Sequence, residues 1–275
     1  MYKVIKVLNN NCILASEGNQ EVILMFKGLG FQKKTGMLFE APRNTKKYLM
    51  QSTNRSRNSS EIVNNIDPLL LEIASEIIKL AKDKFGTISN DILLPLADHI
   101  DFAIKRMDQG IIPHNPFKND IKLLFPDEYS VALKGKNIIE KMMNKVINDD
   151  EVCFITLHIH SAISTNHVTE AMEATRIIHE SIVQIETDLK IKIDLQSISY
   201  TRFMNHIKFL LLRLNTNDRQ QVDISEFTKE KFPFAFHQAK LISQKLSQVL
   251  NKPLPDIEIG YLALHLERIL SSIDE

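Results

Sequence analysis

The pattern of apolar and polar residues divides the chain into a β-rich start and a helical remainder. Near the N-terminus, short β-branched and apolar runs alternate with turn residues. The runs Lys3–Leu8, Cys12–Ser16 and Glu21–Phe26 are separated by Asn9-Asn10-Asn11 and by Glu17-Gly18-Asn19. Runs of five or six residues bounded by Asn and Gly are typical of a small antiparallel sheet. The start of the chain is therefore predicted to be a β domain.

Beyond Pro68 the apolar residues recur with the period of an α-helix. The clearest stripe has members spaced three or four residues apart, which places them on one helix face: Leu96, His99, Ile100, Ala103, Ile104 and Met107. Residues 51–60 are polar and contain no apolar side chain, so they are predicted to be a linker or a long loop. The body that follows is predicted to be mostly helical.

Length and composition exclude several classes of protein. The chain has 275 residues, 44% of them apolar and 25% charged, which is the composition of a soluble globular protein of two or three domains. No stretch approaches the roughly 18 uninterrupted apolar residues of a membrane span, and the N-terminus lacks the apolar core of a signal peptide. Two cysteines, Cys12 and Cys153, do not make a disulfide scaffold. We expect a cytoplasmic protein with two buried thiols and no membrane insertion.

The charge is unevenly distributed although 34 basic residues balance 34 acidic ones. Residues 1–57 hold ten Lys and Arg against three Glu, so they carry a charge of +7 and the remainder carries −7. Such asymmetry favours a polyanionic partner at the basic head. A small, well-solvated basic domain would have the same composition, so charge leaves both interpretations open.

The body contains an internal repeat. Asp98–Arg106 resembles Asn205–Arg213, and Asp149–Ile159 resembles Asp256–Leu266, both at an offset of 107 residues. Two motifs in register at one offset indicate a tandem duplication of helical, domain-sized units of about 105 residues. Asp149 and Asp256, each just before an apolar helix, are predicted to be its N-cap, with Glu151 and Glu258 favourably placed in the first turn.

Each repeat keeps two histidines at equivalent positions: His99 and His158 in the first, His206 and His265 in the second. A histidine among apolar residues is often a core residue whose nitrogens are satisfied, and a duplicated core would explain all four. Zinc binding would need long-range pairing of His99 with His158, because no cysteine cluster or HExxH motif accompanies them. A neutral imidazole can also accept a phosphoryl group, whose added charge can open or close an interface.

Two segments of the head and the repeats carry a resemblance to a known family. Leu8-Asn9-Asn10-Asn11, followed by residues 27–36 (Lys-Gly-Leu-Gly-Phe-Gln-Lys-Lys-Thr-Gly), is similar to the co-antiterminator RNA-binding domain. The repeats resemble two PTS regulation domains. Over nearly its whole length the chain therefore resembles the bacterial transcriptional antiterminators of the BglG/LicT/SacY family.

The resemblance implies a domain organisation and a set of sites. It implies an RNA-binding domain over residues 1–56, a linker over 57–64, and two all-α helical-bundle repeats over 65–169 and 170–275. The implied phosphorylation sites are the four repeat histidines His99, His158, His206 and His265. The implied RNA contacts are Lys6, Asn9, Asn11, Lys27, Gly28, Gly30, Phe31, Gln32 and Lys33. Stacking, amide hydrogen bonds and phosphate neutralisation are how such residue types contact splayed RNA bases.

The head departs from the family pattern at two positions. Phe26 stands where the family usually has glycine, and Lys27 stands where arginine is commoner. Lysine keeps the positive charge but lacks the planar fork of a guanidinium. Phe26 is expected to be a core residue of its strand, with stacking on a base as the alternative. His160 is expected to be incidental, because two residues along a helix turn it about 200° away from His158.

By resemblance, the chain is a homodimeric, non-enzymatic regulator without a cofactor. It would bind an RNA hairpin that overlaps a terminator, without binding DNA, and would receive phosphoryl groups from HPr and from a sugar-specific permease. The alternative is a histidine-based or metal-dependent enzyme of unknown substrate. A DNA-binding repressor with the same sensor domains is a third possibility, but the head lacks a helix-turn-helix pattern.

Overall fold

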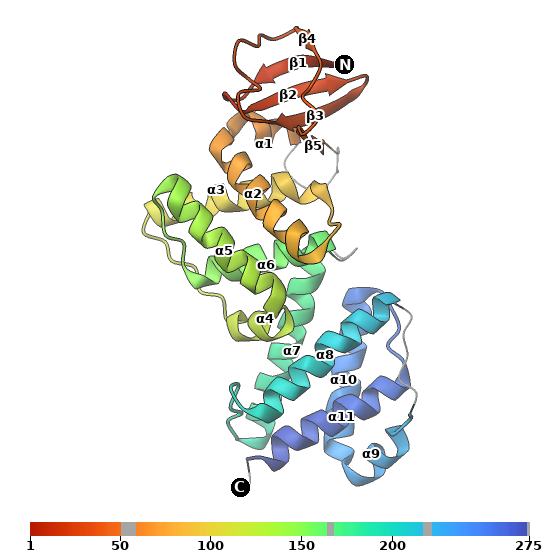
Figure 1. The fold of residues 1–275 in the computed structure, drawn as a ribbon. Coiled ribbons are helices and arrows are strands. Elements are labelled where there is room, and N and C mark those ends of the chain that lie inside the picture. The colour runs from red at the N-terminus through yellow and green to blue at the C-terminus, as the bar shows by residue number, and fades with distance from the viewer. Residues whose placement is uncertain (51–58, 164–167, 217–221, 274–275) are drawn as a thin grey trace. The chain divides into compact units, whose positions relative to one another are not determined.

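The computed structural model describes residues 1–50, 59–163, 168–216 and 222–273. The N-terminal head is a five-stranded antiparallel sheet with the strand order β4-β1-β2-β3-β5 (Figure 1). Its strands are β1 (Tyr2–Val7), β2 (Cys12–Glu17), β3 (Gln20–Met25), β4 (Leu38–Phe39) and β5 (Lys46–Leu49). The three strands expected from the alternating pattern are present, and the predicted fold class, a β head followed by helices, is confirmed.

Both faces of this sheet are covered, because successive side chains of a strand point to opposite faces. One face buries an apolar cluster within the head: Val4, Ile13, Ala15, Val22, Leu24, Leu29 and Phe39. The other face packs on helices and contributes Cys12, Leu14, Ile23, Met25 and Tyr48 to their core. Cys12 and Cys153 are both free and buried, as expected.

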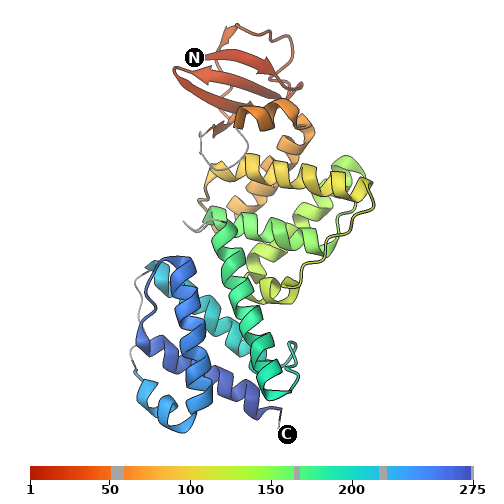
Figure 2. The same cartoon turned by 180° about the vertical axis from the view of Figure 1, so that it is seen from behind.

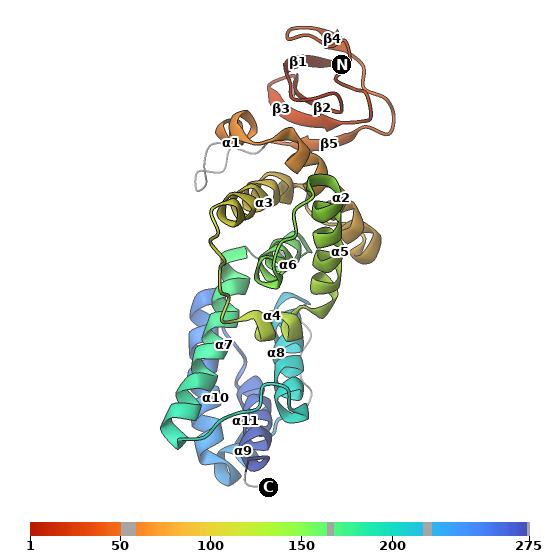
Figure 3. The same ribbon diagram turned by 90° about the vertical axis from the view of Figure 1, so that its left-hand side faces the viewer.

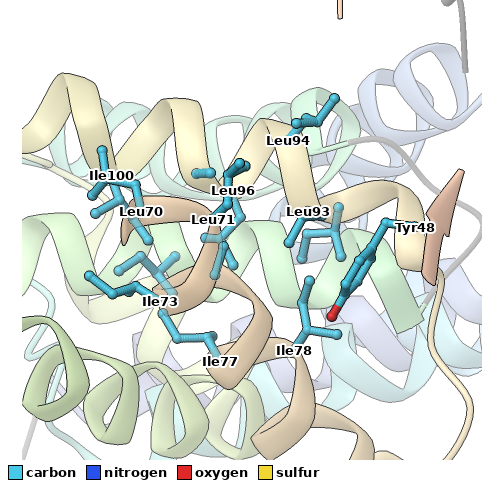
Figure 4. Close-up of a cluster of buried hydrophobic side chains, with 14 of the residues drawn as sticks. Tyr48, Leu70, Leu71, Ile73, Ile77, Ile78, Leu93, Leu94, Leu96 and Ile100 are labelled. Atoms are coloured by element: carbon cyan, nitrogen blue, oxygen red, sulfur yellow. The ribbon is translucent and has the colours of Figure 1, made fainter. Parts of the chain in front are cut away.

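The helices that follow the head extend this second core. They are α1 (Ser59–Asn65), α2 (Pro68–Phe85), the short 3₁₀ helix η1 (Asn90–Ile92), α3 (Leu93–Asp108), α5 (Pro126–Met143) and α6 (Asp149–Ile163). Figure 3 shows α1 and the start of α2 lying beside β5. In Figure 4, Tyr48 reaches from β5 into the apolar cluster that α2 and α3 share. Its hydroxyl lies 2.8 Å from the hydroxyl of Ser75, so the polar tip is satisfied inside the core.

Part of the expected linker is helical. Residues 51–58 lie outside the described residues, but α1 begins at Ser59. The reason is a short apolar series after the polar stretch: Ile62, Val63 and Ile66 are all at least 92% buried and join the core shared by the sheet and α2. The helix α2 then begins after Asp67, whose side chain accepts a hydrogen bond from the backbone N–H of Leu69, with Pro68 in the first turn.

The remaining helices form a second compact unit. They are α7 (Val168–Leu189), α8 (Ile198–Thr216), α9 (Ser225–Lys231), α10 (Pro233–Leu250) and α11 (Asp256–Ser271), and they appear in green to blue in Figure 2. The unit also includes residues 115–127, whose helix α4 (Lys118–Leu124) packs against α7 and α8. Its core includes Tyr200, Phe203, Ile207, Leu246 and Leu262, which are fully buried.

The offset of 107 residues recurs in the helices themselves. Adding 107 to the number of the first residue of α4, α5 and α6 gives the first residue of α9, α10 and α11, respectively. Across the described ranges, every helix is too short or too polar to span a bilayer.

The two aspartates do not cap their helices as predicted. Asp149 lies inside the first turn of α6, and the side chain of Asn148 accepts the hydrogen bond from the backbone N–H of Glu151. Asp256 is the first residue of α11, whose N-cap, Pro255, has no side chain able to accept a hydrogen bond. Each aspartate instead contributes a favourable negative charge at the helix N-terminus. Asp149 also pairs with Lys136, its Oδ1 lying 3.0 Å from the lysine Nζ.

Candidate functional site

The two histidines of the first repeat lie side by side. His99 is on α3 and His158 on α6, and their ring centroids are 5.2 Å apart. The Nε2 of His99 lies 3.2 Å from Oε2 of Glu151, which α6 contributes from its first turn. Arg106, two turns after His99 on α3, donates a hydrogen bond of 2.6 Å to the other oxygen of that carboxylate. The four side chains form one cluster, here called the first histidine cluster.

The second repeat builds the same cluster at positions shifted by 107. The rings of His206 and His265 stack with centroids 4.9 Å apart, and Nε2 of His206 lies 3.5 Å from Oε2 of Glu258. Arg213 donates two hydrogen bonds of 2.8 Å to Glu258, in the bidentate geometry that a planar guanidinium favours. We call this set the second histidine cluster. The four predicted histidines are therefore brought together in two pairs.

Both glutamates are buried and ionised. Glu151 is 1% exposed and Glu258 is 3% exposed. Burial raises the pKa of each carboxyl, but the neighbouring histidine and arginine outweigh burial and hold the pKa below its ordinary value. Removing a carboxylate from water costs several kcal/mol, and its attraction to a close cation returns an energy of about the same size. The stability of each buried glutamate therefore depends on its charged partners.

The other histidine of each pair is neutral. Burial lowers the pKa of His158 to about 3, with repulsion from His99 as a second cause. Burial lowers the pKa of His265 to about 4, and its electrostatic interactions with His206, Arg268 and Arg202 act in the same direction. A neutral imidazole keeps a lone pair on one ring nitrogen, which makes it a nucleophile near neutral pH.

As the described residues form it, the first histidine cluster contains neither a metal site nor a third histidine. In the part of the chain that the structure describes, no three His, Cys, Asp or Glu side chains are placed to hold a metal ion. His160 points away from the first histidine cluster, and its Nδ1 lies 3.0 Å from Oε1 of Glu128 on α5. That contact gives this histidine a structural partner of its own.

In the head, the asparagine triplet and the glycine turn hold each other in place. The side-chain oxygen of Asn9 accepts hydrogen bonds of 2.8 Å from the backbone N–H groups of Asn11 and Cys12. The side-chain oxygen of Asn11 accepts one of 2.9 Å from the N–H of Gly28. At Gly30 a Cβ would lie 2.1 Å from the carbonyl oxygen of Asn9, so only glycine fits there. Gly30 is therefore explained by the close approach of the two turns.

The next predicted RNA-contacting residues lie on the surface after β3. Lys27, Phe31 and Gln32 are exposed, and Phe31 shows 65% of its surface. Lys33 is half-buried, with its Nζ 5.2 Å from the ring centroid of Phe39. The expectation that Phe26 is a core residue is wrong. It follows the last residue of β3 and is 38% exposed, because the strand ends before it.

Three predicted residues of the head contact the first helices: Asn9 and Asn11, which are half-buried, and Lys6, which stays exposed to solvent. The side-chain nitrogens of Asn9 and Asn11 both donate to the carboxylate of Glu72 on α2. The Nζ of Lys6 donates a hydrogen bond of 3.1 Å to the side chain of Asn64 on α1. The two asparagine amides thus point to one side of the turn.

The charged partners of the histidines do not follow from the sequence pattern. The pattern gives Glu151 and Glu258 only a helix-dipole role, and Arg106 and Arg213 only a place in a repeated motif. One feature of the sequence does point to them: the two glutamates are 107 residues apart, as are the two arginines, and the histidines have the same spacing. Glu72 carried no signal, because a glutamate on a helix is by default a solvated surface residue.

A small basic β sheet is followed by duplicated helical units, each with a pair of histidines in contact. This arrangement fits a regulatory protein whose basic head binds a nucleic acid. Comparison with known families agrees with this class. The CAT RNA binding domain matches residues 2–57, and the PRD domain matches twice, over residues 75–162 and 179–269.

Individual relatives cover nearly the whole chain. Protein GlcT of Staphylococcus haemolyticus is 35% identical, over 96% of this chain and 95% of its own length. The beta-glucoside operon antiterminator of Dickeya chrysanthemi is 31% identical, over 99% of this chain and 98% of its own length. Among solved structures, the crystal structure of GlcT CAT-PRDI aligns with a TM-score of 0.52 at 33% identity, over 59% of this chain and 98% of that one.

The chain belongs to the family of antiterminator proteins that join a CAT RNA binding domain to PRD domains. The resemblance inferred from the asparagine triplet and the in-register histidines is therefore confirmed. So is the prediction that the chain is a regulator, since the family is one of antiterminators with an RNA binding domain.

Proposed function

We propose that this chain is a sugar-responsive transcriptional antiterminator. Its head binds an RNA hairpin that overlaps a terminator, and phosphorylation of its repeat histidines by the sugar phosphotransferase system controls that binding. The observation that carries the proposal is the recurrence of one cluster, a histidine pair with a buried glutamate and an arginine, in both repeats. The relatives named above, an antiterminator of a beta-glucoside operon among them, support the same function.

Phosphorylation would act on the charge balance of each cluster. As the new N–P bond forms on a histidine, the donor's bond to phosphorus breaks, and the cluster gains about −1.5 to −2 charge. A phosphate beside the buried Glu151 or Glu258 is strongly repelled, while Arg106 or Arg213 can pair with either anion. The His–Glu contact is thus incompatible with the phosphorylated state, and the packing of α3 on α6, or of α8 on α11, must change.

The phosphoryl donors in this proposal are HPr and a sugar-specific permease of the phosphotransferase system. Phosphate placed by the permease on His99 or His158 inactivates the chain. Phosphate placed by HPr on His206 or His265 activates it. The proposal places the protein in the cytoplasm, where both donors and the nascent transcript are accessible.

The proposal includes a homodimer. Phe102 and Phe209 occupy equivalent positions three residues after a cluster histidine, and they are 56% and 55% exposed. Large apolar side chains exposed at the same place in both repeats support a subunit interface beside each cluster. A phosphate introduced next to such an interface would alter the association of the two copies.

RNA recognition is assigned to the basic head. Phe31 stacks on an unpaired base, Gln32 and the asparagine amides hydrogen-bond base edges, and Lys27 and Lys33 neutralise phosphates. What supports this assignment is the exposure of Phe31, Gln32 and Lys27 on one turn next to the asparagine triplet.

The RNA-binding experiment compares variants on two RNAs, a hairpin selected from a pool with a randomised internal loop and a random-sequence RNA. Phe31→Ala is expected to weaken binding to the selected hairpin much more than to random RNA. Lys33→Ala should weaken both and flatten the dependence of log K on log salt by about one unit. Lys134→Ala removes an exposed lysine from the body and is the matched control. Equal losses on both RNAs for Phe31→Ala would refute its role as a reader.

A further inference from the structure

A carboxylate of the first repeat occupies the asparagine amides of the head. Oε1 of Glu72, on α2, accepts a hydrogen bond of 2.7 Å from Nδ2 of Asn9. Nδ2 of Asn11 lies 3.3 and 3.2 Å from the two carboxylate oxygens. The oxygens of both amides are already used by backbone N–H groups within the turns. The amide nitrogens are therefore the part of each asparagine left for a ligand, and both are bound to Glu72.

A second acidic residue, one helical turn further along α2, makes a similar contact. Nζ of Lys46, on β5, lies 2.9 Å from Oε1 of Glu76 and donates a hydrogen bond of 3.0 Å to Ser75. The side of α2 that faces the head thus presents acceptor oxygens to amide donors and to a lysine of the head. An RNA strand would offer the same chemistry, since phosphates and base carbonyls are also oxygen acceptors.

The repeat indicates that Glu72 is not required by the helical unit itself. The position equivalent to Glu72 in the second repeat is His179. That histidine contacts Asp120 with a separation of 2.8 Å between Nδ1 and Oδ2. The two copies of the repeat therefore fold with different side chains at this position. In the first copy, the described hydrogen bonds of the Glu72 carboxylate all go to the head.

We propose that Glu72 is an internal competitor of RNA. In the state described here it holds the amide nitrogens of Asn9 and Asn11, so RNA must displace α2 from the turn before those amides can contact a base. This inference rests on the proposed function, because it assumes that the two asparagines contact RNA. Beyond that function, it identifies Glu72 as the group through which the first repeat restrains the head.

The experiment measures the Kd of the full-length chain for the selected hairpin RNA. Glu72→Gln keeps the size of the side chain and removes its charge, so its hydrogen bonds to the amides are no longer charge-assisted. Its Kd should fall about tenfold. Asp83→Asn is the matched control, because it removes one exposed carboxylate from the same helix without touching the head. Its Kd should stay within about twofold of wild type, which separates the specific contact from a general change in charge.

A second variant keeps the test valid if the first disturbs folding. Glu72→Asp retains the charge but withdraws it by one methylene from the amides, and it should also bind the hairpin more tightly than wild type. Thermal unfolding of each variant checks that the head and the first helices remain folded. If Glu72→Gln and Glu72→Asp bind as wild type does, or more weakly, the competitor role is wrong and Glu72 merely supports the turn. If neither wild type nor any variant prefers the selected hairpin to random RNA, the proposed function fails and this inference fails with it.

Discussion

Removal of Arg213 should destabilise the second repeat strongly. Glu258 is 3% exposed, and its described partners are Arg213, through two hydrogen bonds of 2.8 Å, and His206 at 3.5 Å. In Arg213→Met the apolar stem is kept, but the carboxylate stays buried with one distant partner. Breaking a buried ion pair in this way costs about 3–5 kcal/mol. With a urea dependence of about 2 kcal/mol per molar, the unfolding midpoint of the second repeat should fall by about 2 M.

The pH dependence gives an independent check on the cause. The pKa of Glu258 is held below its ordinary 4.5, so in wild type the pair contributes stability above that pH and loses it as the pH falls through the lowered pKa. In Arg213→Met the arginine no longer offsets the effect of burial, so the pKa of Glu258 is higher than in wild type. The difference in stability between the two proteins should therefore be largest near neutral pH and should shrink in acid, where the carboxyl is protonated in both.

The assay is urea unfolding of the full chain followed by far-ultraviolet circular dichroism, with two further variants. Arg213→Met combined with Glu258→Gln removes the unpaired charge and should recover part of the loss. Arg176→Met removes another arginine that pairs with two glutamates, but on the exposed surface of α7, so its midpoint should stay close to that of wild type. Equal effects for Arg213→Met and Arg176→Met, or a double variant that loses the sum of both single effects, would show that the unpaired buried carboxylate is not the cause.

Three further results are expected. Gly30→Ala should destabilise the head in thermal unfolding by about 1–3 kcal/mol more than Gly18→Ala. At Gly30 a Cβ would lie 2.1 Å from the oxygen of Asn9, whereas at Gly18, where φ is +61°, it meets no atom within 4 Å and only the left-handed backbone is strained. Burial raises the pKa of Cys12 to about 12, so its thiol should resist Ellman's reagent at pH 8 until the chain is unfolded in urea. The pKa of His265, lowered from 6.5 to about 4, predicts that its imidazole resonances stay in the neutral position in NMR spectra down to about pH 5, and that its folded environment loses stability as the pH falls from 6.5 toward 4.

Periodicity predicted the elements well, because it reports which face of a strand or helix is buried. The stripe containing His99 became α3, with Leu96 and Ile100 fully buried, and the runs in the head became β1 to β3. The histidine pairs could be located because a residue kept in both copies at one offset indicates a shared position in the fold. Helix ends were less predictable. An aspartate before a helix can cap it or lie in its first turn, and at Asp149 the neighbouring Asn148 made the capping bond instead.

Contacts between distant segments could not be predicted, since they depend on packing and not on local pattern. Glu151 in a first turn fits the helix dipole equally well whether it faces solvent or a histidine on another helix. Only the packing of α3 on α6 selects the buried arrangement. Glu72 is a similar case, because its partners Asn9 and Asn11 lie about sixty residues away in the chain.

The most direct test of the central claim, that histidine phosphorylation controls antitermination, is transcriptional read-through in vivo. A reporter placed behind the terminator is measured with and without the inducing sugar for wild type and for the four single alanine variants of the cluster histidines. We expect His99→Ala and His158→Ala to give read-through without the sugar, and His206→Ala and His265→Ala to lose the activation that depends on HPr. If all four variants respond to the sugar as wild type does, the phosphohistidine switch is contradicted and the histidines are core residues.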